Sequence, residues 1–271
     1  MRVCHVTTSD RTLGGLYAGQ HRYFVERGYE VWGASLADSG AWKDAEAEGL
    51  RFRPIPMSRT FNVLQNLRGV LSLYRLCRRE DFDVVEAGTF TGGFVGMVAA
   101  RLAGVPVRIF TVRGLGYEQT GGLAKWIIQA VVRWSCRCAT QVFAVSDEVR
   151  QHCVDDRLCE SGKVEVVLAG SSNGINLERF TLTDALREEG RKVRQEAGIA
   201  DDDMVLGTVA RLKVAKGVSE LVEAFLLLEK RWPGLRLLMV GGFETMHDPV
   251  PRETREIMRD HPRIHHVEQQ R

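Results

Sequence analysis

The chain has 271 residues, of which 44% are hydrophobic and 27% charged, and its formal net charge is +2. This composition is that of an ordinary globular protein, and the length suits two domains better than one. A net charge so close to zero gives no support to a nucleic-acid-binding function. No apolar run reaches the length of a membrane-spanning helix, and the start, MRVCHVTTSD, lacks the apolar core of a signal peptide. We therefore expect a cytoplasmic protein whose six cysteines are reduced and mostly buried.

The first half alternates predicted strands and helices. It opens with the strand Val3–Thr7, a polar loop Thr8–Gly15, a helix through Glu26 and the strand Glu30–Ala34. Further strands are predicted at Phe52–Ile55, Asp83–Ala87, Val105–Val112, Gln141–Val145 and Val164–Leu168. The helices expected between them are Ala41–Glu48, Phe61–Arg79, Gly92–Leu102, Gly121–Cys138 and Asp147–Val154. Such alternation predicts a parallel sheet with helices on both faces, that is, an α/β fold.

A second domain is predicted after a turn-rich segment. Ala169–Thr183 is rich in turn-forming residues, so we place a linker at 169–183 between domains 1–168 and 184–271. The second domain begins with a polar helix at Arg187–Glu196 and contains a later helix at Arg252–Arg259. Its predicted strands are Val205–Ala210, Leu235–Val240 and Ile264–Val267. Because a doubly wound nucleotide-binding half has about five or six strands, we expect this domain to be incomplete.

The most informative stretch is VLGTVARLKVAKGVSELV, at Val205–Val222. A strand ends in a loop that carries Arg211, Lys213 and Lys216, and a helix follows from Val218. Open α/β sheets bind ligands at the carboxyl ends of their strands, and a helix amino terminus favours anions. The loop is therefore a candidate phosphate site, although ordinary solvated cations would give the same pattern.

Several stretches together resemble the retaining glycosyltransferases of family 4, in particular those that build capsule, exopolysaccharide or lipid-linked O-antigen. They are VCHVTTSDRTLGGLYAGQHRYFVERGYEV, GGFVGMVAARLAGVPVRIFTVRGL, VFAVSDEVR, SSNGINLERF, VARLKVAKGVSELVEAF and LRLLMVGGFE, in this order from Met1 to about Val267. The resemblance implies a GT-B fold, in which two Rossmann-like, doubly wound domains face each other across a cleft. The first domain would bind the acceptor and the second a nucleotide-diphosphate sugar.

The resemblance also implies roles for individual residues. Arg211 and Lys216 match the basic pair that holds the donor diphosphate, and fixed cations there would stabilise the charge of the leaving nucleoside diphosphate without a metal or another cofactor. Gly14 and Gly15 match the loop that approaches the donor from the opposite domain. The turn Gly241–Glu244, with Gly241, Gly242 and Glu244, matches a glycine-rich turn near the nucleotide.

The sequence departs from the family pattern at two places. Family members commonly carry a His-Gly pair where this chain has Arg113-Gly114. Arg113 is our candidate catalytic residue; it could clamp a phosphate of a lipid-linked acceptor, or be an exposed loop cation. The second departure is the family's pair of glutamates separated by seven residues, for which no room remains after Glu268.

No metal site is expected. Asp81 and Asp83 have the D-x-D spacing, but they immediately precede a strand, where Asp is a common turn residue. His265 and His266 are neighbours on a predicted strand and would point to opposite faces.

Two basic tracts suggest contact with an anionic membrane surface. Arg51–Arg79 holds seven arginines and no acidic residue, and Gln119–Ser146 holds three basic residues and no acid. In the first tract Arg59, Arg68, Arg75, Arg78 and Arg79 alternate with Leu67, Val70, Leu71 and Tyr74, and the second adds Lys125, Trp126, Arg133 and Trp134. These patterns suit a peripheral protein on the inner face of the membrane, but also an ordinary solvated helix face.

Three functions follow from these observations. The first is a retaining transferase that moves a sugar from a nucleotide-diphosphate donor to a lipid-linked glycan acceptor, with this chain an incomplete form of it. The second is a non-catalytic relative that binds a ligand or a partner, which Arg113 and the absent glutamates favour. The third, a nucleotide-sugar epimerase with the same fold, is disfavoured by SSNGINLERF.

Overall fold

A computed structural model describes residues 1–59, 62–117, 121–171, 173–245 and 248–268. Within it the chain forms two compact units, Met1–Ile175 and Asn176–Arg271, which we call the first and second units. Each unit is described by itself.

The first unit is built on a seven-stranded parallel sheet with the strand order β3-β2-β1-β4-β5-β6-β7. The strands are β1 (Arg2–Ser9), β2 (Glu30–Leu36), β3 (Arg51–Pro54), β4 (Val84–Gly88), β5 (Val107–Val112), β6 (Gln141–Ala144) and β7 (Val164–Val166). The predicted parallel α/β architecture is confirmed. All strands run the same way, so their carboxyl ends gather at one edge.

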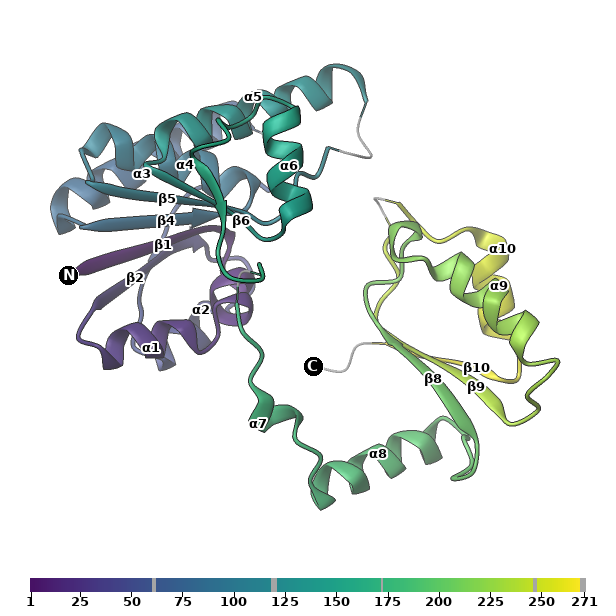
Figure 1. Cartoon of the computed structure of the whole chain (residues 1–271). Coiled ribbons are helices and arrows are strands. Elements are labelled where there is room, and N and C mark those ends of the chain that lie inside the picture. The colour runs from purple at the N-terminus through teal and green to yellow at the C-terminus, as the bar shows by residue number, and fades with distance from the viewer. Residues whose placement is uncertain (60–61, 118–120, 172, 246–247, 269–271) are drawn as a thin grey trace. The chain divides into compact units, whose positions relative to one another are not determined.

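Helices cover both faces of this sheet (Figure 1). One face carries α3 (Val63–Glu80), α4 (Phe90–Ala103) and α5 (Gly122–Cys138), with α4 in contact with both of the others. The other face carries α1 (Gln20–Glu26) and α2 (Trp42–Ala47), which pack on β2 and β3, and α6 (Asp147–Asp155) contacts β6 and β7.

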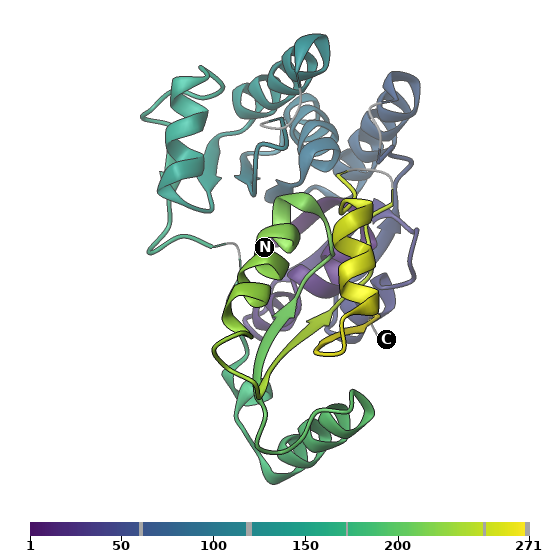
Figure 2. The same ribbon diagram turned by 90° about the vertical axis from the view of Figure 1, so that its right-hand side faces the viewer.

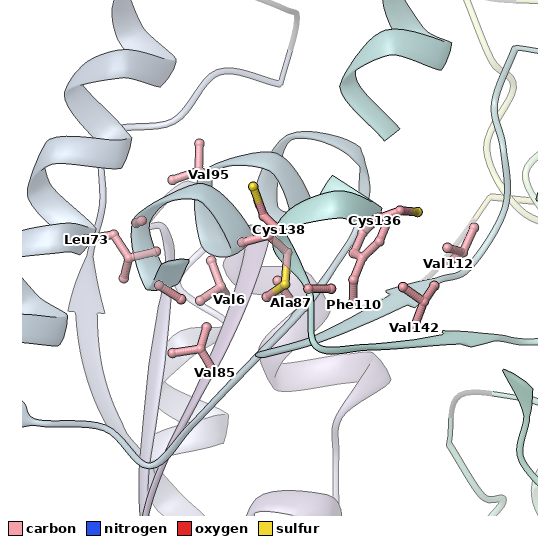
Figure 3. Packing of buried hydrophobic residues seen from close by; sticks show 14 of the residues in the cluster. Val6, Leu73, Val85, Ala87, Val95, Phe110, Val112, Cys136, Cys138 and Val142 are labelled. Carbon is pink, nitrogen blue, oxygen red and sulfur yellow. The ribbon is translucent and has the colours of Figure 1, made fainter. Parts of the chain in front are cut away.

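The main core lies between the sheet and α3, α4 and α5. Figure 3 shows side chains from strands and helices meeting there: Val6, Leu73, Val85, Ala87, Val95, Phe110, Val112, Cys136, Cys138 and Val142. All six cysteines are free and buried, as the sequence predicted. At roughly 25 cal/mol per Å² of buried apolar surface, this layer is the main stabilising element of the first unit.

The second unit contains a three-stranded parallel sheet with the order β10-β9-β8. Its strands are β8 (Met204–Val209), β9 (Leu235–Val240) and β10 (Ile264–Val267). The helices α9 (Val218–Leu228) and α10 (Arg252–Asp260) lie side by side (Figure 2). Leu212, Val222, Phe225, Leu237 and Met239 are the centre of its core.

The structure corrects three local predictions. Thr8–Gly15 is not simply a polar loop, because β1 extends to Ser9 and Thr12–Leu16 forms a π-helical turn, η1. The predicted linker contains a short helix, α7 (Leu177–Phe180). Helix α8 (Asp184–Glu196) begins three residues before the predicted Arg187, because the Thr183 side chain caps it by accepting a hydrogen bond from the Leu186 amide. The start of the predicted helix at Phe61 lies outside the described residues.

Candidate functional site

The cationic loop of the second unit follows β8 at the carboxyl edge of its sheet. Arg211 lies two residues after the end of the strand, and its Nη1 is 3.3 Å from Glu244 Oε2, at the end of the turn that follows β9. Lys216 ends a short 3₁₀ turn, η2 (Val214–Lys216), immediately before α9. The side chains of Arg211 and Lys216 are exposed, and among the described residues no ion pair involves Lys216. The loop therefore presents accessible positive charge at the start of a helix.

This loop is held in one conformation by the segment that follows β9. The Leu212 amide donates to Gly242 O at 2.9 Å, and the Glu244 amide donates back to Leu212 O at 2.9 Å. The Ala215 amide donates to the Asp248 carboxylate at 2.7 Å. Hydrogen bonding of this kind fixes the backbone that carries the cations before a ligand binds, which lowers the entropic cost of binding.

The two glycines of the first unit that were predicted to approach a ligand have different surroundings. A Cβ atom at Gly14 would lie 2.2 Å from the carbonyl oxygen of Ala41, so packing alone requires glycine there. At Gly15 a Cβ atom would meet no described atom within 4 Å. Only Gly15 therefore lacks a packing reason to be glycine.

In the glycine-rich turn after β9, too, one glycine is required by packing and the next is not. Gly241 has a φ of +139°, and a Cβ atom there would lie 1.9 Å from Ala210 O. Gly242 would meet no described atom within 4 Å. The ligand roles of all four glycines stay predictions, and the structure gives Gly15 and Gly242 the space that such a role needs.

A largely buried carboxylate, Glu86 in β4, has a side chain that is 12% exposed and organises the face of the first unit's sheet that carries α1. It accepts hydrogen bonds from the Tyr17 hydroxyl at 2.5 Å and the Thr111 hydroxyl at 2.8 Å. His5 Nδ1 lies 3.2 Å from the same carboxylate. Arg113 Nη2 is 3.6 Å from Glu86 Oε1 and donates to the Tyr17 hydroxyl at 2.8 Å.

The surroundings shift the pKa values in this cluster in opposite directions. Burial alone would raise the pKa of Glu86, but the hydrogen bond and charge of His5 and the charge of Arg113 hold it below its usual value. Burial and the neighbouring Glu86 raise the pKa of Tyr17, so its hydroxyl stays protonated and donates a hydrogen bond to the carboxylate. Burial lowers the pKa of His21 to about 4, so this ring is neutral when it meets Leu13 O in η1, 3.1 Å from its Nε2.

Arg113 is not the exposed loop cation that the sequence allowed as one alternative. Its side chain is only 14% exposed and is paired with Glu86. Its assignment as a catalytic residue stays a prediction.

Comparison with known proteins places the chain in a family. Residues 14–170 match the model of the glycosyl transferase 4-like domain, which is more than half of the chain. This chain belongs to the glycosyl transferase 4-like family. The predicted family and its GT-B fold are thereby confirmed.

Two curated relatives show which members of the glycosyl transferase 4-like family the chain is similar to. The capsular polysaccharide biosynthesis glycosyltransferase CapM of Staphylococcus aureus is 29% identical over 245 residues, covering 90% of this chain and 62% of the relative. The UDP-Gal:alpha-D-GlcNAc-diphosphoundecaprenol alpha-1,3-galactosyltransferase of Escherichia coli is 26% identical over 218 residues, covering 78% of this chain and 54% of the relative. The chain thus spans between a half and two thirds of the length of these two relatives.

Solved structures share the fold of this family member. HepE of Anabaena in complex with UDP-glucose has a TM-score of 0.73 at 17% identity, covering 100% of this chain and 70% of that chain. The UDP-GlcNAc 2-epimerase of Neisseria meningitidis has a TM-score of 0.63 at 14% identity, covering 100% of this chain and 73% of that chain. At these identities the likeness concerns the fold alone, and an epimerase shares it too.

The residues of this glycosyl transferase 4-like chain whose spacing was weighed for a metal make local structural contacts. Asp81 ends α3 in a left-handed conformation, and the Asp83 carboxylate accepts the Arg2 amide at 2.7 Å. His266 Nε2 lies 2.7 Å from Gly241 O at the end of β9. In the described part of the chain, no group of three or more His, Cys, Asp or Glu residues is placed to hold a metal ion. A cavity of about 950 Å³ in the second unit, lined by residues of α8, α10 and β10, does not include the cationic loop.

The predicted membrane-facing tracts are partly confirmed as exposed surface. On α3, Leu64, Leu67 and Leu71 are exposed at helical spacing, whereas Val70 is buried in the core. Arg59 precedes the helix and pairs with Asp38. On α5, the exposed apolar residues are Leu123, Trp126 and Trp134. Among the described helices, none has both the length and the hydropathy needed to span a membrane.

Sequence reasoning missed the Glu86 cluster. The signal was present, because Glu86 is a charged residue inside DVVEAG, a strand predicted to be buried by helices on both faces. A carboxylate in such a place needs donors from other elements. Its partners could not be named from the sequence, because Tyr17 and Thr111 lie 69 and 25 residues away.

Proposed function

We propose that this chain is a retaining glycosyltransferase that moves a sugar from a nucleotide-diphosphate donor to a lipid-linked glycan acceptor during the synthesis of cell-surface polysaccharide. The observation that carries the proposal is the ordered cationic loop between β8 and α9, with Arg211 and Lys216 exposed at the carboxyl edge of a parallel sheet. The names of the relatives support it, since one is a capsular polysaccharide enzyme and another transfers galactose from UDP-galactose to a diphosphoundecaprenol-linked sugar.

The chemistry of transfer explains why cations are needed there. When the bond between the anomeric carbon and the diphosphate breaks, the nucleoside diphosphate leaves with the electron pair, and the acceptor hydroxyl oxygen bonds to that carbon and gives up its proton. Negative charge therefore grows on the leaving group in the transition state. Arg211 and Lys216, together with the first amides of α9, would stabilise that charge better than mobile water does.

Binding of UDP tests this role directly. Arg211→Ala and Lys216→Ala should each weaken the affinity for UDP about tenfold or more, as expected for the loss of a hydrogen bond to a charged group. The measurement is isothermal titration with UDP, with GDP as a second probe for the base. Lys230→Ala is the matched control, because Lys230 is exposed just beyond the opposite end of α9. Unchanged affinity in both loop variants would show that this loop does not bind the diphosphate and only connects β8 to α9. UDP binding without sugar transfer would favour the alternative function, a non-catalytic relative that binds a ligand.

A lipid-linked acceptor would place the first unit against a membrane surface, and α3 and α5 have the surface that this requires. Their first turns lie at the carboxyl edge of the sheet, since each helix follows a strand and returns along it. Leu64 and Leu67 on α3 and Leu123 and Trp126 on α5 are exposed in the first two turns of their helices. Neither Val63–Arg79 nor α5 contains an acidic residue. Apolar side chains next to cations are typical of helices at an anionic membrane surface.

Vesicle sedimentation tests this contact. The protein should bind vesicles of phosphatidylglycerol and phosphatidylcholine at low salt, and binding should fall as ionic strength rises. The double variant Leu64→Ser and Leu67→Ser should lower the bound fraction severalfold, because each leucine contributes about 1.5–3 kcal/mol on burial. Leu227→Ser, which changes an equally exposed leucine on α9, should not. Equal binding by both variants, or none by the parent protein, would leave α3 as an ordinary solvated helix.

A further inference from the structure

The residue that replaces the family's histidine, Arg113, belongs to a matched set. Its guanidinium lies between the ends of β4 and β5. Nη2 donates to the Tyr17 hydroxyl at 2.8 Å, and Cζ lies 4.7 Å from the centre of the Tyr17 ring. A cation over an aromatic face and a hydrogen bond to the same side chain together fix the position of that ring.

Gly88, at the end of β4, provides the space for this guanidinium. A Cβ atom on Gly88 would lie 1.6 Å from Arg113 Nη1 and 2.7 Å from its Cζ. Gly88 pairs with Thr111, two residues before Arg113, on the neighbouring strand. Any larger residue at position 88 would displace the arginine side chain.

Glu86 supplies the opposite charge. A guanidinium that is largely removed from water is costly unless it is paired, and Glu86 is a largely buried carboxylate on the same strand as Gly88. The carboxylate is itself satisfied by Tyr17, Thr111 and His5. Glu86 and Gly88 thus provide the two conditions, charge and space, under which an arginine can occupy position 113.

Tyr17 connects this set to the Gly14-Gly15 turn. It directly follows η1, and its amide donates to Thr12 O at 3.2 Å, which closes the π-helical turn. Its side chain reaches from the turn to Glu86 and Arg113. The position of the turn therefore depends on groups in β4 and directly after β5.

The remaining donors of Arg113 do not fit a phosphate clamp. Nε and Nη1 are buried, and they have no hydrogen-bond partner among the described residues. Nη1 faces Gly88 and Nη2 is used by Tyr17. A bidentate clamp needs two parallel donors that a ligand can reach, and this orientation does not offer them.

We propose that Arg113 is a positioning residue, which acts through Tyr17 to hold η1 and Gly15 in place. Glu86 is its counter-ion, and the absence of a side chain at Gly88 leaves room for its guanidinium. The importance of a fixed turn for sugar transfer rests on the proposed function and on the predicted approach of Gly15 to the donor. The structural role itself does not depend on transfer.

Hydrogen exchange of the full chain tests this role. Arg113→Met and Tyr17→Phe should each speed exchange of the peptide spanning residues 12–18 about tenfold, the factor lost with one hydrogen bond to a charged group. The double variant should exchange no faster than Tyr17→Phe alone, because removing the Tyr17 hydroxyl already breaks its hydrogen bond to Arg113. Gly88→Ala should have the same local effect, and Arg113→Lys an intermediate one.

The matched control is Arg108→Met. Arg108 is a partly buried arginine in β5 whose guanidinium binds the backbone carbonyls of Cys138 and Val105, far from η1. It should leave the peptide 12–18 unchanged. The proposal is overturned if Arg113→Met leaves this peptide unchanged, or if the effects of Arg113→Met and Tyr17→Phe simply add. Tyr17→Phe keeps the ion pair, so it allows the test even if Arg113→Met does not fold. If a variant shows fast exchange of the peptide 12–18 but binds UDP normally, the predicted role of the turn in donor binding is wrong. The positioning of the turn by Arg113 would still hold.

Discussion

Gly14→Ala is expected to lower the free energy of unfolding of the first unit by about 3 kcal/mol or more, whereas Gly15→Ala is expected to change it by less than about 1 kcal/mol. The methyl group at position 14 would lie 2.2 Å from the carbonyl oxygen of Ala41. That oxygen belongs to the backbone at the start of α2, which cannot move without disturbing the helix. At position 15 the methyl group would meet no described atom within 4 Å.

Urea denaturation followed by circular dichroism measures this difference, with the two variants as each other's control. Equal losses of stability in the two variants would contradict the assignment of Gly14 to packing. If Gly15→Ala is as stable as the parent protein, any loss of donor binding in that variant would come from the ligand and not from the fold. The pair therefore separates two roles that the sequence motif Gly-Gly leaves combined.

The sequence predicted the frame of the molecule well, because the frame depends on local patterns. Apolar strands such as Val3–Thr7 and Leu235–Val240 differ by a few residues at most from β1 and β9. Likewise, the cationic loop was predicted from the charges between a strand and a helix, and it lies at the carboxyl edge of β8 as expected. Both predictions need only neighbours in sequence.

The parts that could not be predicted depend on contacts between distant residues. The π-helical turn η1 is supported by Tyr17, whose partner Glu86 lies 69 residues away. The cationic loop is ordered by Asp248, 33 residues beyond Ala215. Nothing in the Gly-Gly motif itself indicates that Ala41 excludes a side chain at Gly14. Long-range packing therefore decided the roles within each predicted site, while local pattern decided where the sites are.

Departures from a family pattern are also easier to interpret as sets than as single residues. Taken alone, Arg113 in place of histidine suggests an altered catalytic group. Beside Glu86 and Gly88 it is a largely buried cation, with Glu86 as its counter-ion and with Gly88 leaving room for its guanidinium. For that reason, Arg113→His alone would remove the guanidinium that pairs with Glu86 and fills the space beside Gly88. This single substitution is a poor test of function.

Gly241→Ala is expected to be the most destabilising single change in the second unit. A methyl group at position 241 would lie 1.9 Å from the carbonyl oxygen of Ala210, and alanine would have to adopt a φ of +139°. Overpacking against backbone and the strained dihedral angle each cost about 1–3 kcal/mol, and together they approach the total stability of a small domain. The backbone cannot relax easily, because the Gly241 amide donates to Val267 O and the Ala210 amide donates to Val240 O.

The expected result is a loss of hydrogen-exchange protection in β8 and β9, together with loss of UDP binding, since Arg211 directly follows Ala210. Gly242→Ala is the control, because a methyl group there would meet no described atom within 4 Å. It should leave the exchange protection of both strands unchanged. Protected strands in Gly241→Ala would show that the end of β9 can shift away from Ala210. Lost UDP binding in Gly242→Ala, with both strands protected, would instead place the ligand against Gly242, because packing could not explain it.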